Sequence, residues 1–279
     1  MSNYFRALLV GVFNAVLIAV GTAGTTLAQA QLDAAAISRL DKSPESAGVL
    51  VYRGETFALQ SASAEPLFRY ERRVSDTTTG LTATHLTRDR RGELIIVESA
   101  QVTSTYGLQR FDVANLQSGY NGSVAVAARG GAQGSAQGSA QGQRLDYYLN
   151  DGGKISTASE DLIDPVISGP SMHGFILTHW DTLTSGKSIA VRMLVLKEKT
   201  TYGFDIRLET QKAGKTSFSV TPSSFLIRLA VAPLRVVFDS NARTVVQYEG
   251  RVPPMEFVAG KFKELDARVD YTPVTPNYR

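Results

Sequence analysis

The chain has 279 residues, 29 Lys and Arg against 26 Asp and Glu, a formal net charge of +3, and no cysteine. No block of like charges stands out, which argues against a nucleic-acid partner. The missing cysteine excludes disulfides, thiolate metal sites, a cysteine nucleophile and the lipid-bearing cysteine of a bacterial lipoprotein.

The first 30 residues have the three parts of a secretory signal peptide. Arg6 supplies a positive charge, an apolar run covers residues 7–20, and Ala28-Gln29-Ala30 is an A-x-A cleavage site. The run is too short to span a bilayer comfortably. We expect cleavage after Ala30 and export to the periplasm. The mature chain is then a single soluble β-rich domain over residues 31–279, without a lipid anchor or a transmembrane segment.

From Gly48 onward, period-2 alternation and short β-branched runs predict strand after strand, about ten in all. The continuous apolar run 189–196 predicts a strand buried on both faces. Residues 202–208 alternate most clearly and predict a half-buried strand. Hairpins are predicted between 81–88 and 93–102, between 106–113 and 123–128, and between 234–239 and 244–249. Further strands are predicted at 49–52, 68–74, 216–220 and 265–271, with strand character at Tyr147 and Leu149.

Residues 130–143 read GGAQGSAQGSAQGQ and contain no apolar anchor. Such a segment cannot bury enough surface to offset its ordering entropy, so it predicts a flexible loop. Two interpretations stay open for this loop, an inert insertion and a partner-binding segment.

Two short helices interrupt the strands. Residues 171–184 can gather apolar side chains on one face, which predicts an amphipathic helix after Pro170. The second is predicted over 222–232, with Thr221 as N-cap and Pro222 at its first position. Together these elements predict a mainly β fold, a large curved antiparallel sheet or half-open barrel with two or three short helices, of the lipoprotein-carrier-like kind. A β-sandwich is the alternative.

Several sequence signatures in the second half resemble a group of uncharacterised, signal-bearing periplasmic proteins of Gram-negative bacteria, of the domain-of-unknown-function type. The match covers roughly residues 165–272, and the resemblance implies location and fold but no catalytic residues. The residues that carry it are Gly174-Phe175, His179-Trp180-Asp181, Pro222-Ser223-Ser224-Phe225-Leu226, Val237-Phe238-Asp239, Val245-Val246-Gln247-Tyr248-Glu249-Gly250 and Asp266-Ala267-Arg268-Val269-Asp270-Tyr271.

The motifs for catalysis are incomplete. Ser171 lies in Gly169-Pro170-Ser171-Met172-His173, where a nucleophile elbow needs glycine in place of the histidine. His173 and His179 are six residues apart and would lie on different faces of a helix, which disfavours a metal site. The acidic residues Glu160, Asp161 and Asp164 are expected in a solvated loop rather than at a glycosidic bond. We therefore favour a protein that is not an enzyme and has neither a cofactor nor a metal.

Binding of a lipid or another apolar small molecule is the first functional hypothesis. Barrel interiors commonly hold such ligands, and apolar helices could cover the mouth of a half-barrel. Apolar helix faces are core more often than ligand site, which favours the alternative that the same side chains seal the sheet with no cavity. A non-catalytic envelope interaction or scaffold protein is the alternative function, and an envelope hydrolase is a third. The candidate ligand-lining residues are Met172, Phe175, Trp180, Phe225, Leu226 and Leu229.

Overall fold

The computed structural model describes residues 48–59, 65–128 and 142–275. The chain divides into two units, residues 1–32 and 33–279, and every described residue belongs to the second. The predicted signal peptide and most of the predicted 130–143 loop lie outside the described residues. In the described part of the chain no helix is both long and apolar enough to cross a membrane.

Fifteen strands, three α-helices and one 3₁₀ helix make up the described chain. In chain order they are β1 (Val49–Ala58), β2 (Phe68–Thr77), β3 (Gly80–Arg88), β4 (Leu94–Thr103), β5 (Leu108–Asn115), β6 (Tyr120–Ala128), β7 (Gln143–Asp151), β8 (Lys154–Leu162), β9 (Val166–Ile167), α2 (Gly169–Thr178), α3 (Trp180–Thr184), β10 (Ile189–Val195), η2 (Leu196–Glu198), β11 (Thr200–Lys212), β12 (Lys215–Pro222), α4 (Phe225–Ala230), β13 (Leu234–Asp239), β14 (Val245–Val258) and β15 (Lys261–Pro273).

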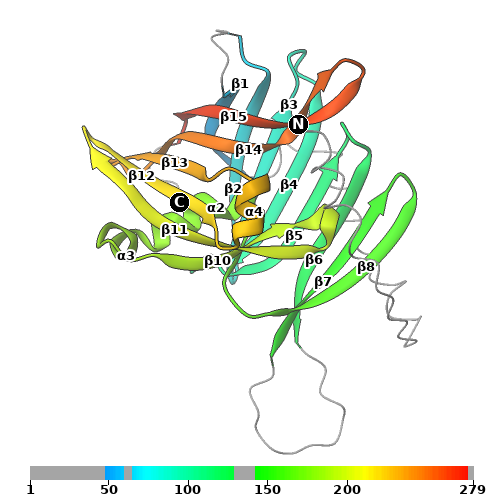
Figure 1. Cartoon of the computed structure of the whole chain (residues 1–279), viewed down its shortest axis with the longest axis horizontal. Coiled ribbons are helices and arrows are strands. Elements are labelled where there is room, and N and C mark those ends of the chain that lie inside the picture. The colour runs from blue at the N-terminus through cyan, green and yellow to red at the C-terminus, as the bar shows by residue number, and fades with distance from the viewer. Residues whose placement is uncertain (1–47, 60–64, 129–141, 276–279) are drawn as a thin grey trace, which may run out of the picture. The chain divides into compact units, whose positions relative to one another are not determined.

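All strands belong to one sheet, in the order β8-β7-β6-β5-β4-β3-β2-β1-β15-β14-β13-β12-β11-β10-β9. Every pair is antiparallel except β9 with β10. The sheet curls into a nearly closed barrel (Figure 1). Across the gap the Thr200 hydroxyl on β11 donates to Glu160 on β8 at 3.2 Å. The prediction of a mainly β, curved antiparallel sheet is confirmed, and its β-sandwich alternative is replaced by one continuous sheet.

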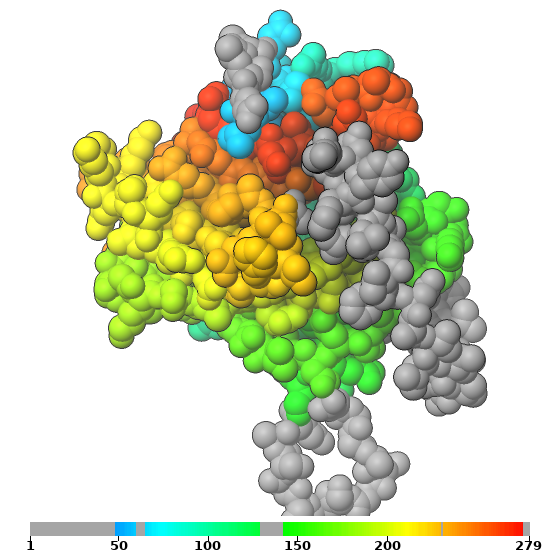
Figure 2. Space-filling view, viewed as in Figure 1, coloured from blue at the N-terminus to red at the C-terminus, as the bar shows by residue number. Residues whose placement is uncertain are grey.

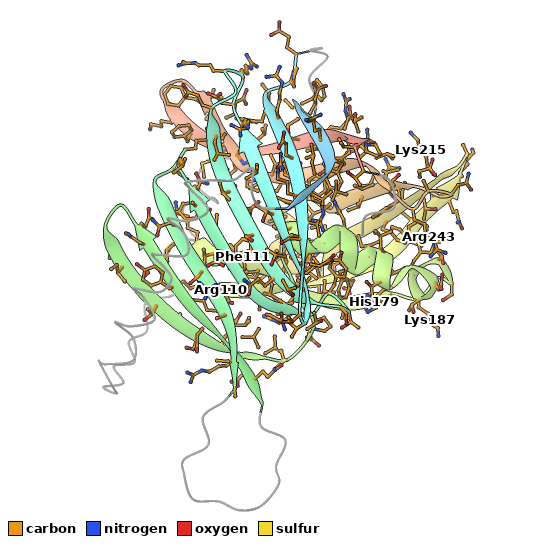
Figure 3. The ribbon with its side chains drawn as sticks, turned by 180° about the vertical axis from the view of Figure 1, so that it is seen from behind. Arg110, Phe111, His179, Lys187, Lys215 and Arg243 are labelled. Atoms are coloured by element: carbon orange, nitrogen blue, oxygen red, sulfur yellow. The ribbon has the colours of Figure 1, made fainter. Side chains whose placement is uncertain are left out.

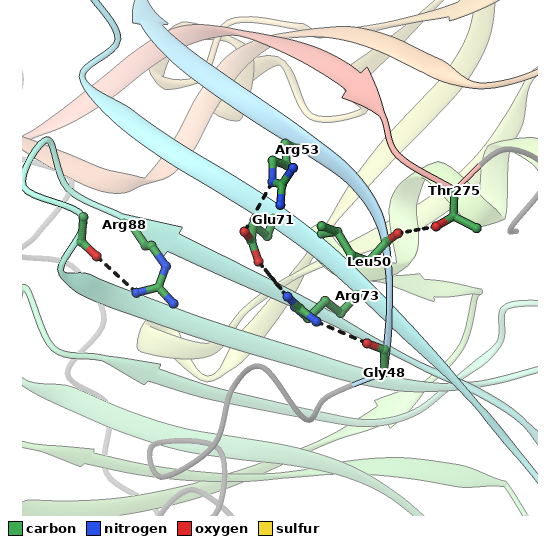
Figure 4. A network of polar contacts seen from close by, with 8 residues as sticks. Gly48, Leu50, Arg53, Glu71, Arg73, Arg88 and Thr275 are labelled. Carbon is green, nitrogen blue, oxygen red and sulfur yellow. Dashed lines mark hydrogen bonds and ion pairs between the residues drawn. The ribbon is translucent and has the colours of Figure 1, made fainter.

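The first and last strands pair at the middle of the sheet, where side chains fix the start of β1. β1 lies between β2 and β15, and the Thr275 hydroxyl donates to the Leu50 carbonyl at 2.7 Å. Arg73 on β2 donates to the Gly48 carbonyl at 3.3 Å and pairs with Glu71. Figure 4 shows these contacts together. These contacts fix where β1 begins between its two neighbouring strands.

Helix α2 lies in the core enclosed by the sheet. Residues Pro170 to Ile176 are all buried, so the helix has no solvent-exposed face over two turns. The predicted single amphipathic helix over 171–184 is therefore wrong in two respects. It is divided into α2, which ends at Thr178, and α3, which begins at Trp180, and α2 is not amphipathic. The physical reason lies in its composition, because residues 169–178 carry no Asp, Glu, Lys or Arg, and a helix without a charged face is stable only when surrounded.

Three other predicted elements need correction. The second helix spans only Phe225–Ala230, with Ser224 as N-cap, because β12 continues through Pro222. Residues 154–162, part of which was expected to be an acidic loop, form edge strand β8. Strand β10 is mostly half-buried rather than buried on both faces, because it lies next to the short edge strand β9.

Candidate functional site

A row of polar side chains crosses four neighbouring strands on the face toward α2. In the strand register Tyr52 lies opposite Arg72, Arg72 opposite His85, and His85 opposite Glu98. All four residues are buried. Lysine, arginine and acidic residues are almost never buried unless paired, so this row is the least expected feature of the interior.

Arg72 is held by neutral groups. Its Nη1 donates to His85 Nε2 at 3.1 Å and to the carbonyl oxygen of Pro170 at the start of α2. Its guanidinium also lies 5.9 Å from the centre of the Tyr52 ring. In the described part of the chain no carboxylate forms an ion pair with it. Burying a cation costs several kcal/mol, which these contacts must offset. The contact with Pro170 also connects α2 to strand β2.

His173 forms the second tie between α2 and the sheet. Its Nδ1 lies 2.5 Å from the Tyr52 hydroxyl. Its ring also packs against Tyr271 and Phe238, with centroids 5.5 and 6.3 Å away. We refer to Tyr52, Arg72, His85 and His173 as the Arg72 cluster. The cluster connects β1, β2 and β3 with α2.

Burial and the Arg72 charge keep both histidines of the cluster neutral. Burial, and then the nearby guanidinium, lower the pKa of His173 to about 3. The same two causes lower the pKa of His85 well below its usual value. Burial alone raises the pKa of Glu98 to about 7. Near neutral pH, Glu98 is therefore the titrating group of this row.

The pocket beside the cluster is small. It has a volume of about 40 Å³, which is room for a few water molecules and too little for a lipid chain. A second pocket of about 210 Å³ lies at the α4–β13 connection and the neighbouring strands, away from the cluster. The first pocket is lined by Val51, Tyr52, Arg72, His173, Gly174, Leu177, Phe238, Arg243, Thr244, Val245, Pro273 and Thr275.

The six predicted ligand-lining residues separate into two groups. Met172, Phe175 and Trp180 are buried in the core. Trp180 packs edge-on against Phe218 at 5.3 Å between ring centroids, and the Arg243 guanidinium lies 5.4 Å from its ring. Figure 3 labels His179, at the end of α2, and Arg243, which lies near the Trp180 ring. The other three residues are exposed on α4: Phe225, Leu226 and Leu229.

The residues weighed for catalysis have structural contacts. The Ser171 side chain is fully buried, and its hydroxyl accepts a hydrogen bond from the Ser168 amide at 2.8 Å, which caps α2. Glu160 accepts a hydrogen bond from the Tyr147 hydroxyl on the neighbouring strand. His179 ends α2 and stacks on Phe175 at 4.2 Å between ring centroids. The described residues contain no group of three or more His, Cys, Asp or Glu placed to hold a metal ion.

Sequence reasoning missed Tyr52, Arg72, His85 and Glu98. One signal was available, because Phe68, Tyr70, Arg72 and Val74 share the parity of one strand face. An arginine among aromatic and aliphatic residues of that face marks a buried charge. Its partners could not be read in the same way, since they depend on the register of three other strands.

No protein-family model and no curated protein matches the chain. Among solved structures the chain is similar to a β-barrel-like protein of domain of unknown function DUF1849 from Brucella abortus, at 9% identity over 82% of this chain and 98% of that chain, with a TM-score of 0.30. It is also similar to a porin-like protein from Bacteroides uniformis, at 9% identity over 80% and 98%, with a TM-score of 0.21.

Proposed function

We propose that the protein is an exported periplasmic binder of an apolar molecule such as a lipid acyl chain, and that the ligand takes the place of α2 inside the barrel. The observation that carries this proposal is the burial of α2 from Pro170 to Ile176. A helix of ten residues is about 15 Å long and about 10 Å wide. Its withdrawal would leave a chamber of that size, lined by the core side chains that now pack on it.

The way α2 is held supports its release. Its polar ties to the sheet are the Arg72 contact with the Pro170 carbonyl and the His173 contact with Tyr52. Hydrogen bonds to a charged group contribute about 1.5–3 kcal/mol each. Only the Arg72 contact is of this charged kind, and the buried apolar side chains of α2 stabilise the filled barrel further. A ligand must offset both contributions, which an apolar chain in the same space can do.

Trp180 makes the proposal testable, because it is the only tryptophan of the chain and it is buried beside α2. The experiment titrates the protein with a dansyl-labelled fatty acid and follows energy transfer from Trp180. We expect binding with transfer and a red shift of the tryptophan emission. The variant Arg72→Met removes one tie and should bind the probe about tenfold more tightly. The matched control is Arg53→Met, at an exposed position of the neighbouring strand.

Two results would reject this function. The first is no binding of the probe by either the wild type or Arg72→Met. The second is binding without energy transfer or a change in Trp180 emission, because the probe would then lie outside the barrel.

Edge strand β8 favours the scaffold function as a second candidate. It ends the sheet order and pairs only with β7, and its side chains alternate between exposed and half-buried. Such an edge can accept a strand from a partner. With a purified candidate partner, Ser156→Pro should abolish the complex if the edge is used, while Ile163→Pro, beyond the strand, should leave it intact.

A further inference from the structure

Two exposed apolar elements follow strands that end at the same end of the barrel. β12 and β14 both pair antiparallel with β13, so their C-terminal ends point the same way. β12 leads into α4, and β14 leads into the turn before β15. With one strand between them, they start about 10 Å apart at the sheet. Figure 2 shows α4 in gold and the β14–β15 hairpin in orange on the same face.

Helix α4 presents its apolar side chains to solvent. Phe225, Leu226 and Leu229 are 69%, 67% and 69% exposed. Arg228 holds the helix in place by donating from Nε to the Pro222 carbonyl at 2.8 Å and from Nη2 to the Ser223 carbonyl at 3.1 Å. Since these acceptors are neutral, the helix keeps a positive charge beside its exposed apolar residues.

The hairpin tip repeats this combination. Phe257 and Phe262 lie opposite each other, pack edge-to-face at 5.2 Å and are 64% and 47% exposed. Ala259 and Gly260 between them have φ angles of 50° and 79°, as a tight two-residue turn requires. Lys261 and Lys263 are exposed on the same tip.

The hairpin is held in position at its base. The Gln117 side chain, from the β5–β6 turn, donates to the Met255 carbonyl at 2.8 Å and accepts from the Met255 amide at 2.7 Å. A two-stranded hairpin alone is marginally stable in water. This tie therefore keeps the aromatic tip presented, even though Phe257 and Phe262 bury little surface themselves.

We propose that these residues dock the protein on a bilayer that contains anionic phospholipid. The apolar rim consists of Phe225, Leu226, Leu229, Phe257 and Phe262. These side chains stand on two separate protrusions, which a fluid bilayer accommodates more readily than a rigid protein surface does. Large apolar side chains next to cationic ones are the composition of interfacial membrane anchors.

The charges around the rim select an anionic surface. In the described part of the chain no ion pair involves Lys261 or Lys263. Glu256 lies opposite Lys263 in the hairpin register, while Glu264 is bound by Arg251 on the neighbouring strand. Lys261 and Lys263 alternate with Phe262 along β15, so their side chains leave the hairpin on the face opposite the two phenylalanines, at the same tip. Together with Arg228 on α4, the two lysines place three positive charges beside the apolar rim. Basic side chains near an anionic bilayer are each attracted to it, and salt weakens the attraction.

The test is co-sedimentation of the full chain, expressed with its own leader so that the cell processes it. The vesicles are phosphatidylcholine with phosphatidylglycerol, against phosphatidylcholine alone. We expect binding to the anionic vesicles that falls as salt is added. Phe257→Ser with Phe262→Ser, and separately Leu226→Ser with Leu229→Ser, should each weaken it about tenfold. The matched apolar control is Ile163→Ser. Ile163 is 69% exposed and follows the C-terminal end of β8, which lies at the end of the barrel opposite to that of β14.

A charge-reversal pair separates the roles of the lysines. Lys261→Glu with Lys263→Glu should abolish the preference for phosphatidylglycerol. Lys212→Glu with Lys215→Glu should not, because these lysines lie at the β11–β12 turn, at the end of β12 opposite to α4. Failure of the wild type to bind anionic vesicles, or unchanged binding by the rim variants, would overturn the proposal. So would rim variants that change only self-association in sedimentation equilibrium. The proposal does not depend on ligand binding inside the barrel, because its variants touch neither α2 nor the Arg72 cluster.

Discussion

The titration of Glu98 should make its own, separable contribution to the pH dependence of stability between pH 4.5 and pH 7. Burial raises its pKa to about 7 from an ordinary value of 4.5. Between these two pH values the folded state keeps a proton that the unfolded state has released. The contribution of Glu98 to the free energy of unfolding therefore falls as the pH rises from about 4.5 to about 7. A difference of this size corresponds to about 3 kcal/mol.

The variant Glu98→Gln removes the titrating group while keeping a polar side chain of similar size. We expect it to match the wild type at pH 4 and to be about 3 kcal/mol more stable at pH 8. The assay is urea unfolding followed by Trp180 fluorescence at several pH values in this range. The comparison between the two proteins isolates Glu98, because the neighbouring histidines titrate in both.

The histidines of the Arg72 cluster act in the opposite direction. The lowered pKa of His173 means that the unfolded state takes up a proton first, so stability falls as the pH falls from 6.5 toward 3. With Glu98→Gln this acid-side loss should remain, and without the opposing contribution of Glu98 it should be larger between pH 7 and pH 4.5. If the difference in unfolding free energy between the variant and the wild type did not grow from pH 4.5 to pH 7, the reasoning about Glu98 would fail.

Three further changes test the packing of α2 and the hairpin. His173→Phe should reduce the loss of unfolding free energy between pH 7 and pH 4 by about 3 kcal/mol, measured by urea unfolding; an unchanged loss would place the acid sensitivity elsewhere. Gly174→Ala should lower the free energy of unfolding by about 1–3 kcal/mol, because the new methyl group would lie 1.9 Å from the Tyr106 ring. Adding Tyr106→Leu should recover part of the lost stability. Losses that simply add in the double variant would contradict this reasoning. Ala259→Gly should gain about 1 kcal/mol in thermal unfolding by relieving a left-handed backbone, while Gly260→Ala should lose a similar amount; a loss from the first change would refute the turn argument.

Strands with strong alternation were predictable, and strands without it were not. The long strand β11 follows directly from period-2 alternation, and the hairpin formed by β3 and β4 follows from β-branched runs on both sides of turn residues. β8 reads KISTASEDL and carries small polar side chains on both faces. As an edge strand it needs little apolar surface, so its hydrogen-bonding partner β7 decides its structure. β9 is only two residues long, which is too short for an alternation pattern to show.

The interior site was less predictable than the fold because it depends on register. Arg72 meets His85 through the β2–β3 register and Pro170 through the position of α2. Neither distance follows from sequence spacing, since the second contact joins residues 98 positions apart. The exposure of α4 was equally hidden. An apolar helix of six residues predicts burial by composition, and only its place between β12 and β13 leaves it in solvent.

The width of the sheet explains why the interior contains a helix at all. Barrels of about eight strands can be filled by side chains alone, and the enclosed space grows with strand number. A 15-stranded sheet that curls on itself must therefore fill its interior with another element, or with a ligand, or leave it to water. Here α2 does so, and it brings the Pro170 carbonyl to the buried Arg72 and His173 to the Tyr52 hydroxyl. The helix and the Arg72 cluster therefore depend on each other. Any ligand that replaces α2 must therefore fill the apolar space that the helix occupies now.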